Sequence, residues 1–459
     1  MNRPPPRRTF LDALRGRGVP ELKQRLAPCL LALLLAACAA PEKRHSPAEL
    51  QAYRSADFSW PAAAQRAELS MLALERERLP QRLADPTQLP AALAAIMLFN
   101  IEIDAGRAPL LAALPALSAQ PAERQRLLLT AAHTLYAADA APLLWPLLSK
   151  LAGPREFSIA AYTLLKADAA AAPALREALR QRADCCDEPR LQALQAALDP
   201  AAASEPPLAE LLAVPLKPGL PVVFSLQRPG RRAMGLALLR GADGRFVRDA
   251  DGQLLQIPQL ALARSGLPGT ITAGNTPRGL FTVRGAGTAG NRWIGPTPYL
   301  HSMLPIESSL AEFRHEAEQG QRWSEAAYDA LLPASWRVPL REAWLAGLAG
   351  RDDILMHGTT INPAYYRGEP YFPGTPSAGC LVAAEQWSET DGRLLASDQL
   401  RLVQAFSADG HDRGFLIVAE LPGVGAVSLD EQLESAVRAA EHQMLEARKP
   451  SMATQGSPR

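Results

Sequence analysis

Residues 354–381 read ILMHGTTINPAYYRGEPYFPGTPSAGCL, a stretch that predicts both a buried strand and a reactive turn. Its apolar start runs into His357 and Gly358, which indicates a strand that delivers a histidine to a turn. A loop rich in Pro, Gly and Tyr follows and returns at Gly379 and Cys380. Two strand ends can therefore bring the imidazole and the thiol side by side. A cysteine next to an imidazole and facing backbone N–H groups has what acyl transfer requires.

A structural interpretation competes with this one, because free cysteines are mostly small buried hydrophobic residues. A histidine at a strand end is also often only hydrogen-bonded. The surrounding pattern favours chemistry: His-Gly-Thr, a Gly/Pro loop and Ser-x-Gly-Cys-Leu resemble the catalytic signature of the L,D-transpeptidase (YkuD) family. A second stretch, GNTPRGLFTV at 274–283, resembles the Thr-Pro-x-Gly-x-Phe hairpin that precedes the active site in that family.

The resemblance assigns roles to individual residues. It makes Cys380 the nucleophile and His357 its general base, with the backbone carbonyl of Gly358 orienting the imidazole. Backbone N–H groups around Gly379 and Cys380 are expected to form an oxyanion hole, where preorganised donors commonly contribute several kcal/mol. The residues expected to contact the substrate are Ser377, Gly379, Thr359 and Tyr366.

The sequence departs from the family pattern at two positions. Ala378 stands where a second histidine is usual, and Val382 stands where Arg or Asn is common. The first change should spare the nucleophile, whereas the second leaves open how a substrate carboxylate or amide is held.

The N-terminus indicates export and lipidation. The first 37 residues carry seven basic and two acidic side chains and lead into the apolar run LLALLLAA before Cys38. That run is too short to span a bilayer and is typical of a signal peptide, residues 1–37. Leu-Ala-Ala-Cys resembles the bacterial lipobox, which makes Cys38 the lipidated residue and the periplasmic side of the outer membrane the expected location. An ordinary cleaved signal is the alternative.

Composition sets the remaining limits. The chain has 459 residues, 48% of them hydrophobic, and a formal charge of +1, which leaves about −4 after the basic signal is removed. This composition indicates a globular protein, and the near-neutral charge gives no reason to expect nucleic-acid binding. Cys185 and Cys186 are adjacent and are expected to pack at a helix end rather than form a strained disulfide. No metal-ligand spacing is present, and no cofactor is implied.

The chain divides into several predicted segments. Residues 38–46 form a flexible tether, and residues 47–199, rich in Ala, Leu, Glu and Arg, form a helical domain. Segments 131–141 and 160–170 align at an offset of 29, which suggests paired helices stacked as a short solenoid. This domain either recruits a protein partner or serves as a spacer, and His133 is expected to sit in its helix packing.

Residues 200–220 read as a linker and residues 221–420 as the catalytic domain, with Asp-Gly hairpin turns at 243 and 251. The expected fold class is therefore multidomain α+β: an all-α repeat-like domain followed by a mostly antiparallel β-sandwich. An insertion at about 299–350 carries helices near 310–318 and 324–332. It either packs on the domain through its tryptophans or caps the cleft. The aromatic groups expected either to line that cleft or to pack are Tyr299, His301, Tyr365 and Tyr366.

Residues 421–459 are expected to form a C-terminal helix that ends near Arg448, followed by a disordered tail. Ser428 and Glu431 have the spacing of a capping box at the start of that helix.

Three functions remain after this reasoning. The first is a periplasmic enzyme, a cysteine-dependent L,D-transpeptidase that cross-links peptidoglycan stem peptides, or attaches envelope protein to them, through a thioester. The second is a peptidoglycan amidase or peptidase in which water resolves the same thioester. The third is a non-catalytic scaffold lipoprotein with a degenerate domain, for which Ala378 and Val382 are the best support.

Overall fold

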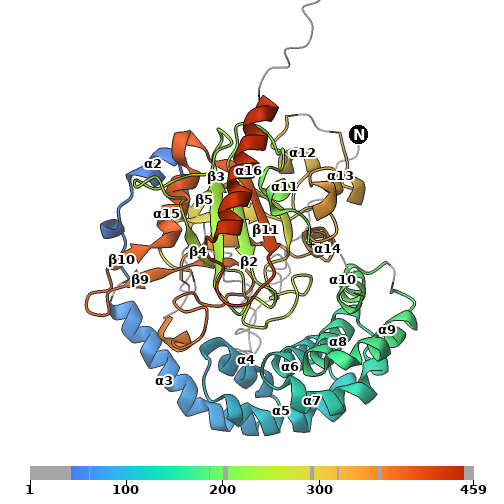
Figure 1. Cartoon of the computed structure of the whole chain (residues 1–459). Helices are drawn as coiled ribbons and strands as arrows, with labels where there is room; N and C mark the ends of the chain where they lie inside the picture. Colours follow the sequence, from blue (N-terminus) through green and yellow to red (C-terminus); the bar gives the residue numbers. More distant parts are fainter. Residues whose placement is uncertain are drawn as a thin grey trace, which may run out of the picture.

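The computed structural model describes residues 43–60, 62–185, 187–199, 205–289, 294–317, 320–359 and 363–448. A β-barrel forms the C-terminal part, and an arc of helices follows one side of it (Figure 1). The barrel strands are β2 (Val222–Gln227), β3 (Gly235–Arg240), β4 (Ile257–Leu260), β5 (Gly279–Thr288), β6 (Tyr299–Met303), β7 (Ile354–His357), β8 (Leu381–Ala383) and β11 (Arg413–Glu420).

The eight strands close on themselves in the order β5-β11-β2-β3-β4-β8-β7-β6, and β6 pairs again with β5. Two pairs of adjacent strands, β11–β2 and β7–β8, are parallel, and the other pairs in the barrel are antiparallel. The prediction of a mostly antiparallel β-sandwich is therefore wrong, because the sheet is a closed mixed barrel. The coarser expectation of helices followed by a β-containing part agrees with the structure.

The closure depends on the long strand β5. Residues Gly279–Arg284 pair with β11 on one edge, and residues 282–287 pair with β6 on the other. The β6 register shifts between Val283 and Ala286, where Gly285 has a φ of +101°. An irregularity of this kind bends a strand and increases its twist. Such a bend lets one strand belong to both walls of a barrel.

Apolar side chains fill the barrel interior. Phe281, Met356 and Leu381 belong to one buried cluster that also includes Val403 and Phe406 of helix α15 (Asp398–Phe406). Because alternate residues of a strand point to opposite faces, the neighbours of Met356 and Leu381 in the sequence face outward.

A second buried cluster covers the outer face of β2, β3, β5 and β11. The helices on this face are α11 (Leu208–Leu212), α12 (Leu310–Phe313), α13 (Glu325–Asp329), α14 (Glu342–Leu348) and α16 (Glu431–Arg448). Trp336 and Trp344 are buried in this cluster, and Trp323 packs against it. The tryptophans of the predicted insertion thus serve packing. The insertion itself is shorter than predicted, because its first residues, 299–303, are barrel strand β6.

The N-terminal helices are α3 (Ala62–Ala84), α4 (Leu89–Phe99), α5 (Arg107–Ala113), α6 (Ala122–Leu135), α7 (Ala137–Leu144), α8 (Pro154–Ala167), α9 (Ala172–Arg180) and α10 (Pro189–Leu198). In sequence order α4 packs on α6, α6 on α8, and α8 on α10. His133 is buried among them, as predicted, and burial followed by the charge of Lys166 lowers its pKa to about 3. Cys185 packs partly buried against the same core, and Cys186 lies outside the described residues.

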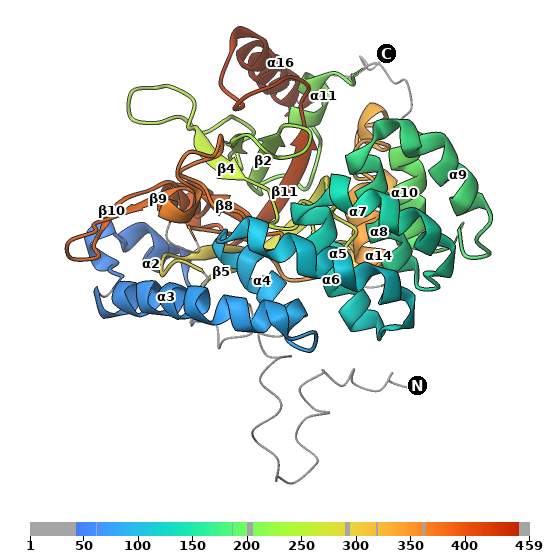
Figure 2. The same cartoon turned by 90° about the horizontal axis from the view of Figure 1, so that it is seen from below.

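The helical arc packs directly on the barrel, and Figure 2 shows it from below, in front of the strands. Leu267 and Ile271, from the loop between β4 and β5, are fully buried in the helical core. Thr134 Oγ1 donates to the Ser265 carbonyl at 3.2 Å, and Arg190 donates to the carbonyl of Ala349. The arc and the barrel therefore share apolar core as well as hydrogen bonds.

Three predicted boundaries change. Residues 43–45 of the expected tether form strand β1 (Lys43–His45), which pairs antiparallel with β5. The next residues form α2 (Pro47–Ala52), which packs on α15. Residues 58–60 contact the hairpin formed by β9 (Glu385–Trp387) and β10 (Leu394–Ser397). Part of the expected linker forms α11, with Leu211 and Leu212 buried. No helix in the described parts of the chain is long and apolar enough to cross a membrane.

Candidate active site

Cys380 and His357 belong to neighbouring strands. β7 and β8 pair in parallel with Met356 opposite Leu381 and His357 opposite Val382, which sets Cys380 beside Leu355. Met356 and Leu381 face the barrel interior, so Leu355, His357 and Cys380 share the outer face. The two groups singled out in the sequence thus lie diagonally across one strand pair.

The thiol is held against β7. Cys380 is buried, with 7% of its surface exposed, and packs with Ile294, Tyr299 and Leu355. The Leu355 N–H donates to Sγ at 3.5 Å, and Sγ lies 3.7 Å from the Asp353 carbonyl oxygen. The Leu355 N–H favours the thiolate, since hydrogen bonds to the charged form stabilise that form, whereas donation from Sγ to the Asp353 carbonyl favours the protonated thiol.

The imidazole of His357 is oriented by its own turn. Its Nδ1 lies 2.7 Å from the carbonyl oxygen of Gly358, the contact that the family resemblance implies. A carbonyl oxygen can only accept, so Nδ1 carries the proton and Nε2 is left as the basic nitrogen. The side chain is buried, with 1% exposed.

The turn before the cysteine is tied to both motifs. Ser377 Oγ accepts from the Gly379 N–H at 2.9 Å and donates to the Cys380 carbonyl at 2.8 Å. Thr276, from the Thr-Pro-Arg-Gly stretch, donates to the Gly379 carbonyl at 2.9 Å. Because the Gly379 amide already donates to Ser377, its use as an oxyanion donor stays a prediction that requires this bond to open.

Two residues predicted to contact the substrate, Thr359 and Tyr366, are buried and packed within the protein. The hydroxyl of Thr359 is buried and accepts from the Glu385 N–H at 3.0 Å. Tyr366 is buried in an apolar cluster with Met234, Leu260 and Tyr371, and not in the cluster that holds Cys380. Burial raises the pKa of Tyr366, against the smaller opposing effect of the Arg264 charge.

Strand β6 supplies two further side chains on the thiol's face. His301 lies opposite Leu355 in the β6–β7 pairing, which places Tyr299 opposite His357. Tyr299 also packs against Cys380 in the same apolar cluster. The sequence suggested either a cleft or a packing role for these residues, and the structure packs Tyr299 against the cysteine, while His301 lies opposite Leu355.

Arg351 was not anticipated from the sequence. It is buried, with 6% exposed, and its Nη1 donates to the carbonyls of Gly269, Ile271 and Asn275 at 2.7, 2.9 and 3.1 Å. Its Nη2 donates to the Gly274 carbonyl at 2.6 Å. Burial lowers the pKa of Arg351 to about 10, and the charge of the Cys380 thiolate is the largest opposing effect. The guanidinium thus stays charged at neutral pH and interacts with the sulfur.

Gly379 makes this approach possible. Its φ is +120°, and a Cβ there would lie 1.8 Å from Arg351 Nη2 and 2.5 Å from the Gly274 carbonyl oxygen. A larger residue would push the guanidinium away from the cysteine turn. The glycine before the cysteine is therefore required by the arginine as well as by the backbone.

A buried carboxyl lies behind the histidine. Glu385 is 1% exposed, and its Oε1 accepts from Thr297 at 2.6 Å and from Ser397 at 2.7 Å. A Cβ on Gly358 would lie 2.3 Å from this carboxyl group. Burial raises the pKa of Glu385 to about 7, against the opposing hydrogen bonds and the charge of His357. No pattern in the sequence had pointed to Glu385.

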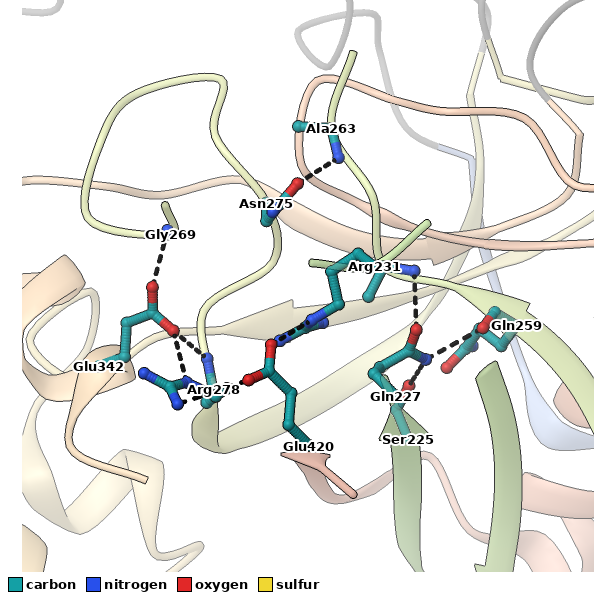
Figure 3. Close-up of polar contacts among 11 residues, drawn as sticks. Ser225, Gln227, Arg231, Gln259, Ala263, Gly269, Asn275, Arg278, Glu342 and Glu420 are labelled. Carbon is teal, nitrogen blue, oxygen red and sulfur yellow. Dashed lines mark hydrogen bonds and ion pairs between the residues drawn. The ribbon is translucent and has the colours of Figure 1, made fainter. Parts of the chain in front are cut away.

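A polar network holds the loop that surrounds Arg351 (Figure 3). Glu342 accepts from the N–H of Gly269 at 2.7 Å and from the backbone and Nε of Arg278 at 3.0 and 3.1 Å. Glu420 accepts from Arg231 at 2.8 Å and pairs with Arg278 at 3.5 Å. The side chain of Asn275 accepts from the N–H of Ala263 at 2.8 Å. Arg278, from the Thr-Pro-Arg-Gly stretch, thus ties this loop to Glu342 and Glu420.

The lipidation residue Cys38 lies outside the described residues. In the described part of the chain, no group of three His, Cys, Asp or Glu side chains is placed to hold a metal ion. Comparison of the chain with protein-family models, curated proteins and solved structures gives no significant match. The function is therefore argued from the geometry around Cys380.

Proposed function

We propose that this protein is a cysteine-dependent acyltransferase of the L,D-transpeptidase type that acts on peptidoglycan stem peptides. One observation carries the proposal: Cys380 and His357 share the outer face of a parallel strand pair, and Gly358 fixes the imidazole in the tautomer that can accept a proton. A thiol and a basic imidazole nitrogen on one face are the requirements of cysteine acyl transfer.

The reaction would run in two halves. The proton of the Cys380 thiol passes to His357 Nε2, and the thiolate attacks the carbonyl carbon between an L centre and a D residue. The C–N bond breaks, the leaving amine takes the proton from His357, and the acyl group stays on sulfur as a thioester. An acceptor amine then attacks the thioester, gives its proton to His357, and the thiolate leaves.

The surroundings of the sulfur support this chemistry. The Leu355 N–H and the Arg351 guanidinium both favour negative charge on Sγ. The apolar contacts of Ile294, Tyr299 and Leu355 limit water around it.

The proposed setting is the cell envelope. The lipobox-like segment supports a lipid anchor on Cys38 and a place on the periplasmic side, with the outer membrane favoured because Ala follows the cysteine. The balanced charge supports peptide rather than nucleic-acid partners.

The test is intact-mass analysis of the purified protein after incubation with a carbapenem and, separately, with a stem tetrapeptide. We expect a covalent adduct on the unsubstituted protein and none on the Cys380→Ala variant. The Cys185→Ala control should still form the adduct. His357→Ala should slow adduct formation by roughly 100-fold or more. An adduct on Cys380→Ala would overturn the assignment. Peptide dimers among the products indicate transfer, and shortened monomers alone indicate hydrolysis.

A further inference from the structure

A cavity of about 360 Å³ lies between the helical arc and the barrel. Helices α4, α6 and α8 form one wall, and residues 264–265, 271–273 and 377–378 of the barrel loops form the other. Its size is in the lower range of small-molecule sites in proteins. The site is therefore built jointly by the two parts of the chain.

The cavity adjoins the nucleophile. Ala378, which lines it, precedes Cys380 by two residues, and a chain spans at most about 3.6 Å per residue. The wall at Ala378 thus lies within roughly 7 Å of the Cys380 backbone. The short side chain of Ala378 keeps this end of the cavity open, where a larger side chain would fill it.

The charged lining is mostly cationic. Arg126, Arg155 and Arg264 line the cavity together with a single acid, Glu123. Arg126 is paired with Glu156, which is buried behind it, at 3.0 Å. The other two arginines carry charge that the cavity itself does not neutralise.

Arg155 and Arg264 are short of partners. Within the described residues, Arg155 makes no side-chain hydrogen bond or ion pair, and burial followed by the charges of Arg190 and Arg126 lowers its pKa. The Nε of Arg264 is buried and has no hydrogen-bond partner in that same part of the chain, while the rest of its guanidinium interacts with the neutral hydroxyl of Tyr366. The backbone N–H of Arg264 donates to the Ser377 carbonyl at 2.9 Å, which ties this arginine to the cysteine turn.

We infer that the cavity binds a carboxylate-bearing segment of the peptide substrate, with Arg155 and Arg264 holding the carboxylate; this inference rests on the proposed function. A guanidinium offers a planar pair of N–H donors that matches a carboxylate. Apolar neighbours such as Leu98, Ile159 and Ile271 leave these cations weakly solvated and suit an aliphatic peptide. Val382 cannot supply such a contact beside Cys380, whereas Arg155 of helix α8 and Arg264 of the barrel loop supply it from the two walls of the cavity.

The test measures binding without turnover. The full chain carrying Cys380→Ala is titrated by calorimetry with a stem tetrapeptide as the free acid and with the same peptide in which every carboxyl is amidated. We expect the free acid to bind at least about ten-fold tighter. Adding Arg155→Gln and Arg264→Gln should remove this preference, whereas Arg180→Gln, an exposed arginine of α9 outside the cavity, should keep it. The matched pair Arg155→Lys and Arg264→Lys keeps the charge and should keep part of the preference.

Equal binding of acid and amide, or a preference that survives the double glutamine substitution in a protein of unchanged thermal midpoint, would overturn the inference. Failure of the proposed function looks different. In that case the protein with Cys380 intact forms no thioester with the peptide, although the acid preference can still be measured. Thioester formation without any acid preference would leave the proposed function standing and remove the cavity from it.

Discussion

Arg351 connects the reactive cysteine to the loop between β4 and β5. Its guanidinium interacts with the Cys380 thiolate, and its four hydrogen bonds all go to loop carbonyls. The residue precedes β7 in the sequence GRDDI, which resembles an exposed polar turn. Its importance lies in contacts across about 80 residues of chain, and such contacts leave no local pattern.

Removing this cation should make the thiol less acidic. In an Arg351→Gln variant the thiolate loses a positive charge that interacts with it, and a nearby opposite charge shifts a pKa. We expect iodoacetamide alkylation of Cys380 at pH 7 to slow by roughly ten-fold, with the pH profile moved upward.

Arg351→Lys is the matched control, because it keeps the charge and loses the fork of donors. Its alkylation profile should stay close to that of the unchanged protein even if its stability falls. Equal slowing in both variants would show that the loop contacts matter and the charge does not.

Glu385 should make stability fall as the pH rises. Burial raises its pKa from the usual 4.5 to about 7, so the folded protein keeps a proton that the unfolded chain loses. The contribution of Glu385 to the free energy of unfolding is therefore complete below pH 4.5 and is lost as the pH rises to about 7. The difference amounts to roughly 3 kcal/mol.

Glu385→Gln removes this titration. Relative to the unchanged protein, the variant should gain stability between pH 4.5 and 7, measured as free energies of unfolding in urea at several pH values. A difference between the two proteins that stays constant across this range would contradict the raised pKa.

At the level of residues, the sequence was informative where the chemistry is local. His357, Gly358 and Cys380 follow from a strand, a turn and a glycine that lie within 27 residues of one another. Arg351 and Glu385 were missed because their partners come from distant loops. Tyr366, chosen for its place in an aromatic loop, packs in an apolar cluster of its own.

Among the elements, the C-terminal helix α16 shows how a cap can be misplaced by two residues. The helix begins at Glu431, not within the predicted Ser428 box, and the side chain of Asp430 accepts from the Leu433 N–H at 2.8 Å. Ser428 and Asp430 are both exposed, so replacing either one changes helix capping with little effect on packing.

Asp430→Ala should therefore lower the free energy of unfolding by about 1 kcal/mol, the usual cost of a lost N-cap. Ser428→Ala should change it by less than about 0.5 kcal/mol, as for most exposed positions. Urea denaturation of both variants measures this difference. A larger loss of unfolding free energy for Ser428→Ala would show that Ser428 caps the helix, as predicted from the sequence.

Strands were easier to predict than their pairing. Val222–Gln227 follows from a short apolar run rich in Val and Phe, and the hairpin turns follow from their Asp-Gly pairs. The closure of the barrel does not, because β11 pairs in parallel with β2 from nearly 200 residues away. Pairing at that range depends on the whole chain, and the bend at Gly285 that permits it resembles an ordinary turn glycine.

In the whole molecule, the loop between β4 and β5 links the helical arc to the surroundings of the cysteine. Ile271 is the clearest link, because its side chain is buried in the helical core while its carbonyl accepts from Arg351 at 2.9 Å. The sequence suggested a spacer or a recruiting surface for these helices, and no pattern in either half points to this contact. The packing implies that the arc stabilises the surroundings of the thiol.

Ile271→Ala tests this coupling. Truncating a buried isoleucine usually costs about 2–5 kcal/mol, and here the loosened loop should also release Arg351 from its carbonyls. Leu175→Ala in α9 is the matched control, since Leu175 is equally buried in the same helical core but lies outside the loop. We expect Ile271→Ala to slow alkylation of Cys380 at pH 7 by several-fold under conditions where both variants are folded, and Leu175→Ala to leave it unchanged. If both variants slow the reaction alike, the effect is general loss of stability, and the helices do not act on the thiol through this loop.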